Sequence, residues 1–273
     1  MLARFAGLIA VCVFVVPASA DTPKKGATLV SAEGKLAVGG GSAGSGAAIV
    51  AGTGINAGED AHAELDLGDA RIAVAPQTVF HVFGSPAPKG SKKLVVSDST
   101  LTSGVVRVST SKATTINTPA GKVLLDAATD AKLHVDKGVT RVSVHKGSAK
   151  LGGVGIAEGF GLRVGKGKPA KLPDAPVWTA MPKSKLTTKG EVPAEVKAVL
   201  GGVATVWHVQ VAMNATFTEF LTDAQLEAKT TTLVFEQKLT PGRYWVRISA
   251  IDAVGLEGPW SAVAPTEIIS AKP

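Results

Sequence analysis

Apolar and polar residues alternate along several segments of the first half of the chain, and this alternation constrains the fold most. Ala63, Leu65 and Leu67 are separated by polar residues, and Val106 and Val108 flank an arginine. Successive side chains of a strand point to opposite faces, so a period of two predicts strands with one buried face. The 31 glycines and the 5% of aromatic residues suit short strands joined by tight turns. We therefore expect an all-β protein.

A short motif, apolar-x-x-Gly-x-x-Arg-apolar, recurs in this half of the chain. It occupies residues 65–72, 101–108 and 135–142, and a looser copy with lysine in place of arginine occupies 144–151. Each copy is interpreted as strand, glycine turn and strand, because glycine tolerates the positive φ of a tight turn. Stacked copies predict a β-solenoid-like fold or a rolled β-sandwich. A plain meander of hairpins is the alternative.

The cation of each copy holds an equivalent position. These residues are Arg71, Arg107, Arg141 and Lys150. If the copies stack in register, the four side chains form a row on one face, and this candidate binding ladder suits an acidic partner strand or an anionic polymer. Local pairing of each cation with a nearby acid is the alternative.

Aromatic residues divide the chain into two parts. All four tryptophans and the single tyrosine follow residue 170, just after the Lys/Pro/Gly stretch GKGKPAKLPDAP. We expect a first β-domain at 21–165, a linker at 166–175 and a second domain at 176–273. The lysines of the linker region are interpreted as a solvated segment, or alternatively as a contact with anionic envelope polymers or lipid head groups.

Residues 1–20 have the features of an export signal. Arg4 precedes an apolar run at 6–16, and an Ala-Ser-Ala site follows. The run is shorter than the roughly 20 apolar residues that span a bilayer, so we expect cleavage before Asp21 and no transmembrane segment afterwards. An uncleaved anchor, or a lipid on Cys12, is the alternative. Because Cys12 is the only cysteine, the mature chain is expected to have no disulfide and no thiol chemistry.

The first part resembles the FecR family of periplasmic β-domains across roughly residues 27–164. The resemblance rests on G-x-x-I-x-A-G at 52–58, L-x-x-G-x-V-R-V at 101–108, T-P-A-G at 118–121 and V-x-V-x-x-G at 142–147. It implies a β-solenoid-like fold and a role in protein–protein signalling or in the envelope, without catalysis.

The chain departs from the signalling members of that family. Those members carry a cytoplasmic anti-sigma segment and a membrane helix before the β-domain, whereas an export signal is predicted here. This departure argues against direct control of transcription. The Gly-Thr pair that the family has before a late strand is replaced by Ala127-Ala128-Thr129.

The second part is similar to fibronectin type III domains. The L-x-P-G-x-Y corner of those domains is matched by Leu239, Pro241, Gly242 and Tyr244. The resemblance implies a β-sandwich in which Tyr244 caps the corner by bonding backbone through its hydroxyl. Residues 206–217 are predicted as a partner strand with Trp207 in the core, and 222–229 as a short helical turn.

Residues that would support catalysis or metal binding do not form a recognisable pattern. The five histidines lack the spacing of a zinc site, although a hairpin could bring His134 and His145 together. The Gly/Ser segment 39–44 formally matches a hydrolase elbow and a dinucleotide fingerprint, but no helix is predicted after it. No catalytic residue, metal or cofactor is therefore expected.

These observations predict a non-catalytic, exported binding or scaffold protein of the periplasm or cell surface. Its expected partner is an envelope protein or an anionic cell-wall polymer. Nucleic acid is not expected, although the formal charge is +7, because an exported chain without an aromatic-rich basic surface is not of that class. A relay component of an envelope signalling pathway and a polysaccharide- or peptidoglycan-acting enzyme are the alternatives.

Overall fold

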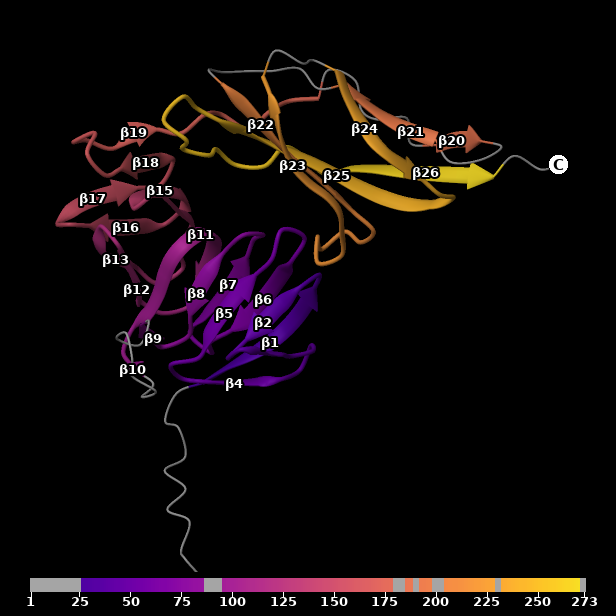
Figure 1. Cartoon of the computed structure of the whole chain (residues 1–273). Helices are drawn as coiled ribbons and strands as arrows, with labels where there is room; N and C mark the ends of the chain where they lie inside the picture. Colours follow the sequence, from indigo (N-terminus) through magenta and orange to yellow (C-terminus); the bar gives the residue numbers. More distant parts are fainter. Residues whose placement is uncertain are drawn as a thin grey trace, which may run out of the picture.

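The computed structural model describes residues 26–85, 95–178, 185–188, 192–197, 204–228 and 232–270. Every regular element in these ranges is a β-strand, which confirms the all-β prediction (Figure 1). Within the same ranges, no helix is long and apolar enough to cross a membrane. The predicted export signal at 1–20, with Cys12, lies outside the described residues.

The N-terminal unit, residues 26–172, contains two sets of paired strands that share the long strand β11. Sheet 1 consists, in spatial order, of β4 (Ala48–Val50), β1 (Gly26–Glu33), β6 (His62–Asp66), β7 (Ala70–Val74), the second half of β11 (Ser99–Thr110), β14 (Asp130–Asp136), β15 (Val139–Lys146), β18 (Phe160–Arg163) and β19 (Ala170–Lys171). Sheet 2 consists of β3 (Gly41–Ser42), β2 (Leu36–Val38), β5 (Gly54–Ala57), β8 (Val79–His81), the first half of β11, β12 (Thr114–Thr118), β13 (Gly121–Leu125), β16 (Ser148–Leu151) and β17 (Val154–Ala157). A separate pair is formed by β9 (Gly84–Ser85) and β10 (Val95–Val96).

Both sheets contribute side chains to one hydrophobic core. Along β7, Ile72 and Val74 are buried while Arg71 and Ala73 are exposed, as the alternation predicts. Phe80 of sheet 2 is also fully buried in this core. The polar outer face of sheet 1 therefore remains available for contacts outside the unit.

The four copies of the glycine motif adopt different structures. The copies at 65–72 and 135–142 form hairpins, β6–β7 and β14–β15, as predicted. The copy at 101–108 is instead part of the single strand β11, so its prediction as strand, turn and strand is wrong. The copy at 144–151 leads from β15 in sheet 1 to β16 in sheet 2, and these two strands do not pair with each other.

Gly104 explains why the second copy stays a single strand. Its φ is +88°, and β11 passes there from pairing with β8 in sheet 2 to pairing with β14 in sheet 1. Thr78 fixes this passage, because its Oγ1 accepts from the Val105 N–H at 2.9 Å and donates to the Val105 carbonyl at 3.1 Å. The glycine thus serves a change of sheet and not a hairpin turn.

The C-terminal unit comprises the described residues from 173 onward. Its larger sheet has the order β20 (Lys185–Thr188), β26 (Ala264–Ser270), β25 (Gly242–Ile251), β22 (Val206–Ala212) and β23 (Phe220–Glu227). A second pair consists of β21 (Val192–Lys197) and β24 (Thr232–Leu239). Trp207 is 1% exposed in the core of this unit, which confirms its predicted place.

The predicted helical turn at 222–229 is wrong. Residues 220–227 form β23, which pairs with β22 along its length. Ala, Gln, Leu and Glu favour a helix in isolation, but a neighbouring strand offers a ladder of hydrogen bonds that overrides weak local propensity.

Tyr244 is buried at the start of β25, and its hydroxyl donates a 2.9 Å hydrogen bond to the Thr240 carbonyl. Pro241 is exposed in the connection between β24 and β25, and Leu239 is the last residue of β24. Gly242 begins β25, where an added Cβ would lie 3.5 Å from the Tyr244 hydroxyl.

We expect Tyr244→Phe to lower the free energy of unfolding by about 1 kcal/mol, because it deletes only the hydroxyl that makes this bond. Urea unfolding of the full chain measures the effect. Thr240→Ala is the matched comparison: it removes the Thr240 hydroxyl, which lies 3.3 Å from the Tyr244 oxygen, but keeps the backbone acceptor, so it should cost less. Unchanged stability of Tyr244→Phe would mean that the bond contributes nothing.

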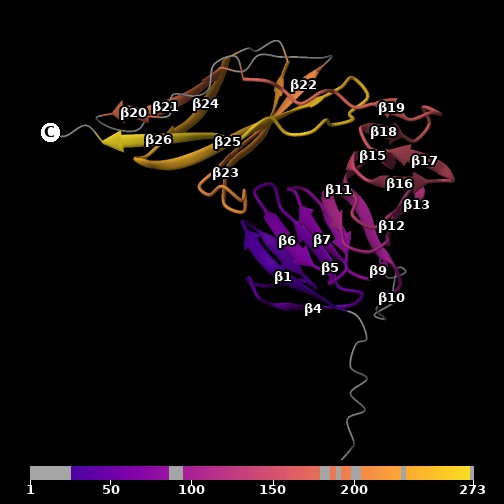
Figure 2. The same cartoon turned by 180° about the vertical axis from the view of Figure 1, so that it is seen from behind.

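The two units lie against each other. In both views the C-terminal unit lies across one side of the N-terminal unit, beside β6, β7 and β15 (Figures 1 and 2). β19 lies inside the predicted linker 166–175 and pairs with β18, and Leu172 is buried. Leu256 of the β25–β26 connection is also buried, close to Leu172 and Gly161. The first half of the predicted linker therefore belongs to the N-terminal unit.

Candidate functional site

The predicted binding ladder is not arranged as one row. Arg71 on β7 lies opposite Ser109, two residues from Arg107, and its Nη1 is 3.4 Å from Glu64. Arg107 on β11 makes two bonds to Asp130, of 2.9 and 2.7 Å. Arg71 and Arg107 therefore each pair with a nearby acid, which is the alternative that the sequence offers to a binding ladder.

Arg141 lies on the same outer face of sheet 1 as Arg71 and Arg107, on β15. It is opposite His134 and Arg163, and its Nε donates to the Val254 carbonyl at 2.9 Å. Lys150 is on β16 in sheet 2 and is exposed. Three of the four cations therefore share one face at staggered positions, and only Lys150 lies in the other sheet.

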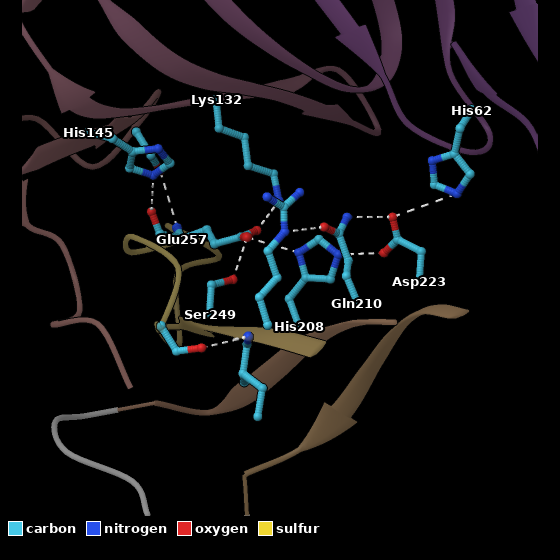
Figure 3. A network of polar contacts seen from close by, with 12 residues as sticks. His62, Lys132, His145, His208, Gln210, Asp223, Ser249 and Glu257 are labelled. Atoms are coloured by element: carbon cyan, nitrogen blue, oxygen red, sulfur yellow. Dashed lines mark hydrogen bonds and ion pairs between the residues drawn. The ribbon is translucent and has the colours of Figure 1, made fainter. Parts of the chain in front are cut away.

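Polar side chains of the two units meet where the units touch, and sequence reasoning missed them (Figure 3). His62, Lys132 and His145 project from the outer face of sheet 1, on β6, β14 and β15. The larger sheet of the C-terminal unit supplies the polar face opposite its Trp207 side: His208, Gln210, Asp223, Arg247 and Ser249. Strand alternation places each set of side chains on one face of its sheet. No local sequence pattern indicates that these two faces lie against each other in the folded chain.

Glu257, in the connection between β25 and β26, lies at the centre of this network (Figure 3). Its side chain is 3% exposed and forms an ion pair with Lys132 of the N-terminal unit. His208 Nδ1 lies 2.8 Å from its Oε1, and Ser249 Oγ donates to the same oxygen at 2.5 Å. Burial by itself would raise the pKa of Glu257, but Lys132 and His208 hold the pKa well below its usual range.

The backbone of Glu257 is also bound by the N-terminal unit. Its N–H donates to Ser143 Oγ at 3.2 Å, and its carbonyl accepts from His145 Nε2 at 3.0 Å. A single residue of the C-terminal unit thus makes three polar contacts across the interface. Such a fully bonded residue fixes the relative position of the two units.

His208 has both ring nitrogens bound to carboxylates. Its Nε2 lies 2.5 Å from Asp223, which also accepts from Gln210 at 2.9 Å. Burial alone would lower the pKa of His208, but Glu257 and Asp223 outweigh burial and raise the pKa to about 9. His208 is therefore an imidazolium at neutral pH, and neither nitrogen is free to accept a proton from a substrate.

A cavity of about 340 Å³ lies next to the network and is lined by both units. Arg247 is part of its wall: Nε donates to Gln210 Oε1 at 2.8 Å, and the guanidinium carbon lies 3.9 Å from the Phe217 ring centroid and 4.5 Å from that of Trp260. Burial, together with the nearby Arg107, lowers the pKa of Arg247 to about 10. The cavity therefore has aromatic walls and a cation.

The remaining histidines do not form a metal site in the part of the chain that is described. His134 lies opposite Arg141 and not near His145, so the predicted hairpin pair does not form. His62 stacks on Phe220 with ring centroids 4.0 Å apart. Burial lowers the pKa of His62, His81, His134 and His145, most for His134, where burial and the nearby Lys132 bring it to about 4.

These lowered pKa values predict that acid destabilises the chain. Unfolded histidine binds its proton near pH 6.5, so a group with a lower pKa in the folded chain contributes stability above pH 6.5 that is lost as the pH falls toward the folded value. We expect the free energy of unfolding to fall by about 1 kcal/mol between pH 6.5 and 5 from His134 alone. Denaturant titrations at both pH values test this, with His134→Asn as the variant whose loss should be smaller; higher stability at pH 5 would contradict it.

Known protein families give no match for this chain. No protein-family model matches it, and no curated protein matches it. The resemblances to the FecR family and to fibronectin type III domains accordingly stay predictions. The case for a function therefore rests on the residues of the chain itself.

Proposed function

We propose that the chain is an exported, non-catalytic binding or scaffold protein of the cell envelope. In this proposal the N-terminal unit is a FecR-like β-domain, solenoid-like or a rolled sandwich, and the C-terminal unit is a fibronectin III-like sandwich. The first twenty residues support export, and the all-β architecture is compatible with both resemblances. The expected partner is an envelope protein or an anionic cell-wall polymer.

One observation carries the non-catalytic part of the proposal: the ionisable groups gathered at the interface are bound to one another. A general base needs a free acceptor atom and a pKa near the working pH. Both nitrogens of His208 are occupied and its pKa is about 9. The pKa of Asp223 is lowered by His208 despite burial, and Lys132 and His208 hold the pKa of Glu257 well below its usual range, so neither carboxylate takes up protons near neutral pH.

The same network supports a scaffold role. The network joins one sheet of each unit through buried charged groups. Removing any one of these groups leaves its partner buried without a compensating charge, which lowers the stability strongly. A binding surface that spans both units needs this fixed geometry, because loss of orientation on binding costs free energy. The network is thus interpreted as the element that makes the two units one rigid body.

The proposal is tested by expressing the tagged chain in its native cells. We expect it in the periplasmic or surface fraction, with Asp21 as the first residue by mass spectrometry, and cross-linked in intact envelopes to one abundant protein or retained by the cell wall. A cytoplasmic protein with Met1 intact would overturn the proposed location. Release of sugar or peptide fragments from purified cell walls would overturn the non-catalytic assignment.

A further inference from the structure

We infer that the cavity between the two units binds a small organic monocarboxylate, whose carboxylate is received by the guanidinium of Arg247. The inference rests on the proposed binding function and names a ligand class for it. The volume of about 340 Å³ lies near the lower end of the range of about 300 to 1,000 Å³ typical of small-molecule sites. The ligand is therefore small.

Among the charged residues that line the cavity, one cation has no anionic partner. Each carboxylate that lines the cavity has a cationic partner, and the pairs are Glu64 with Arg71, Asp223 with His208, and Glu257 with Lys132. The lining residue Arg107 is bound by Asp130, which lies outside the lining. Arg247 forms no ion pair with a described carboxylate, since the nearby Asp223 and Glu257 are bound by His208 and Lys132, so the site as a whole favours one negative charge.

The guanidinium of Arg247 is held ready for a ligand. Gln210 binds its Nε, and the Phe217 and Trp260 rings lie 3.9 and 4.5 Å from its central carbon. Its two Nη atoms make no hydrogen bond with the described residues, since the one side-chain bond that Arg247 makes there uses Nε. Two parallel N–H donors fit the two oxygens of a carboxylate, and fixing them in advance reduces the entropy lost on binding.

The lining also indicates the rest of the ligand. Ser109, Thr216 and Thr218 bring hydroxyl groups to the wall, and Phe220 adds an apolar surface. A hydroxylated carbon skeleton, such as that of a sugar acid, can use both kinds of contact. A dianion such as a phosphate monoester would bring a second charge without a partner into a buried site, which is costly.

The test is isothermal titration calorimetry of the full mature chain with D-glucuronate. D-glucose is the matched neutral probe, because it differs only in carrying a hydroxymethyl group in place of the carboxylate. We expect glucuronate to bind with a Kd below about 1 mM and glucose to give no detectable binding. A tri-uronate is the third probe and distinguishes two sources of the carboxylate. If glucuronate binds, a free acid suffices as the ligand. If only the tri-uronate binds, the ligand is the end of a polymer.

Two variants locate the binding. Arg247→Lys keeps the charge but loses the planar fork, and should weaken glucuronate binding about tenfold or more. Ala73→Trp places a large ring in the cavity from an exposed lining position on β7, opposite Arg107. It should abolish binding while leaving the unfolding curve close to that of the parent. Lys150→Gln, which removes an exposed cation on β16 outside the cavity, is the control and should bind as the parent does.

The inference is overturned if neither acid binds, or if Ala73→Trp binds as tightly as the parent. Equal binding of glucose and glucuronate would overturn the assignment of a carboxylate. These results are independent of where the chain resides in the cell. Failure of the proposed envelope role shows in fractionation, whereas failure of the cavity assignment shows only in calorimetry.

Discussion

Glu257→Gln is expected to lower the free energy of unfolding by about 3 kcal/mol. The substitution keeps the shape of the side chain but removes the charge that compensates Lys132, whose side chain is only 12% exposed. Removing one partner of a buried ion pair costs more than the pair contributes, because the remaining charge has lost water and gained nothing in return. Denaturant unfolding of the full chain, followed by far-UV circular dichroism, measures the effect.

The control for this prediction is Glu227→Gln, which removes the same charge from an exposed position on β23 and should change the stability by less than about 0.5 kcal/mol. The double variant Lys132→Met with Glu257→Gln tests the pair itself. Its loss should be smaller than the sum of the two single losses by about 1 kcal/mol or more, because the second change removes the charge that the first left uncompensated. Additive losses would show that the two residues do not form a coupled pair.

Glu257→Gln should also weaken the contact between the two units. Glu257 contacts Lys132, Ser143 and His145 of the N-terminal unit, and the contact of its side chain is the one charged link among these three. We therefore interpret the network as a charged link that holds the two units, which differ in composition, against each other. Local alternation places Lys132, Ser143 and His145 on the outer face of their strands, yet the network depends on their contact with Glu257 of the other unit.

The class of fold and much of its local structure could be predicted from the sequence. The alternation around Leu65 and Val106 predicts strands with one buried face, and both residues are fully buried. Trp207 was placed in the core from its partner strand. Such signals are readable because each depends on residues close together in the chain.

The candidate site could not be predicted in the same way. Lys132 and Glu257 are 125 positions apart, and the connection that holds Glu257 has no periodicity that marks a buried acid. The equivalent cations of the motif predict one row of four, but only Arg71, Arg107 and Arg141 lie on one face of sheet 1, at staggered positions. Lys150 lies in sheet 2, because its copy of the motif leads from one sheet into the other.

Gly104→Ala tests this change of sheets and should destabilise the chain by about 3 kcal/mol or more. Two costs add: the left-handed φ of +88°, which disfavours a side chain by about 1 to 2 kcal/mol, and the crowding of a new Cβ. That Cβ would lie 2.5 Å from the Thr78 Cα and 2.7 Å from the Gln77 carbonyl oxygen. These are backbone atoms, and they cannot withdraw without breaking the two bonds that Thr78 makes to Val105.

Gly138→Ala separates the two costs. Gly138, in the turn of the β14–β15 hairpin, has a similar φ of +77°, but an added Cβ would meet nothing within 4 Å. It should therefore lose only the conformational part, about 1 kcal/mol. If denaturant unfolding shows equal losses for both variants, the close approach of β11 to Thr78 contributes nothing and the sheet change at Gly104 is not fixed by that contact. A loss for Gly104→Ala that exceeds the Gly138→Ala loss by about 2 kcal/mol identifies Gly104 as the position where the chain must lack a side chain to belong to both sheets.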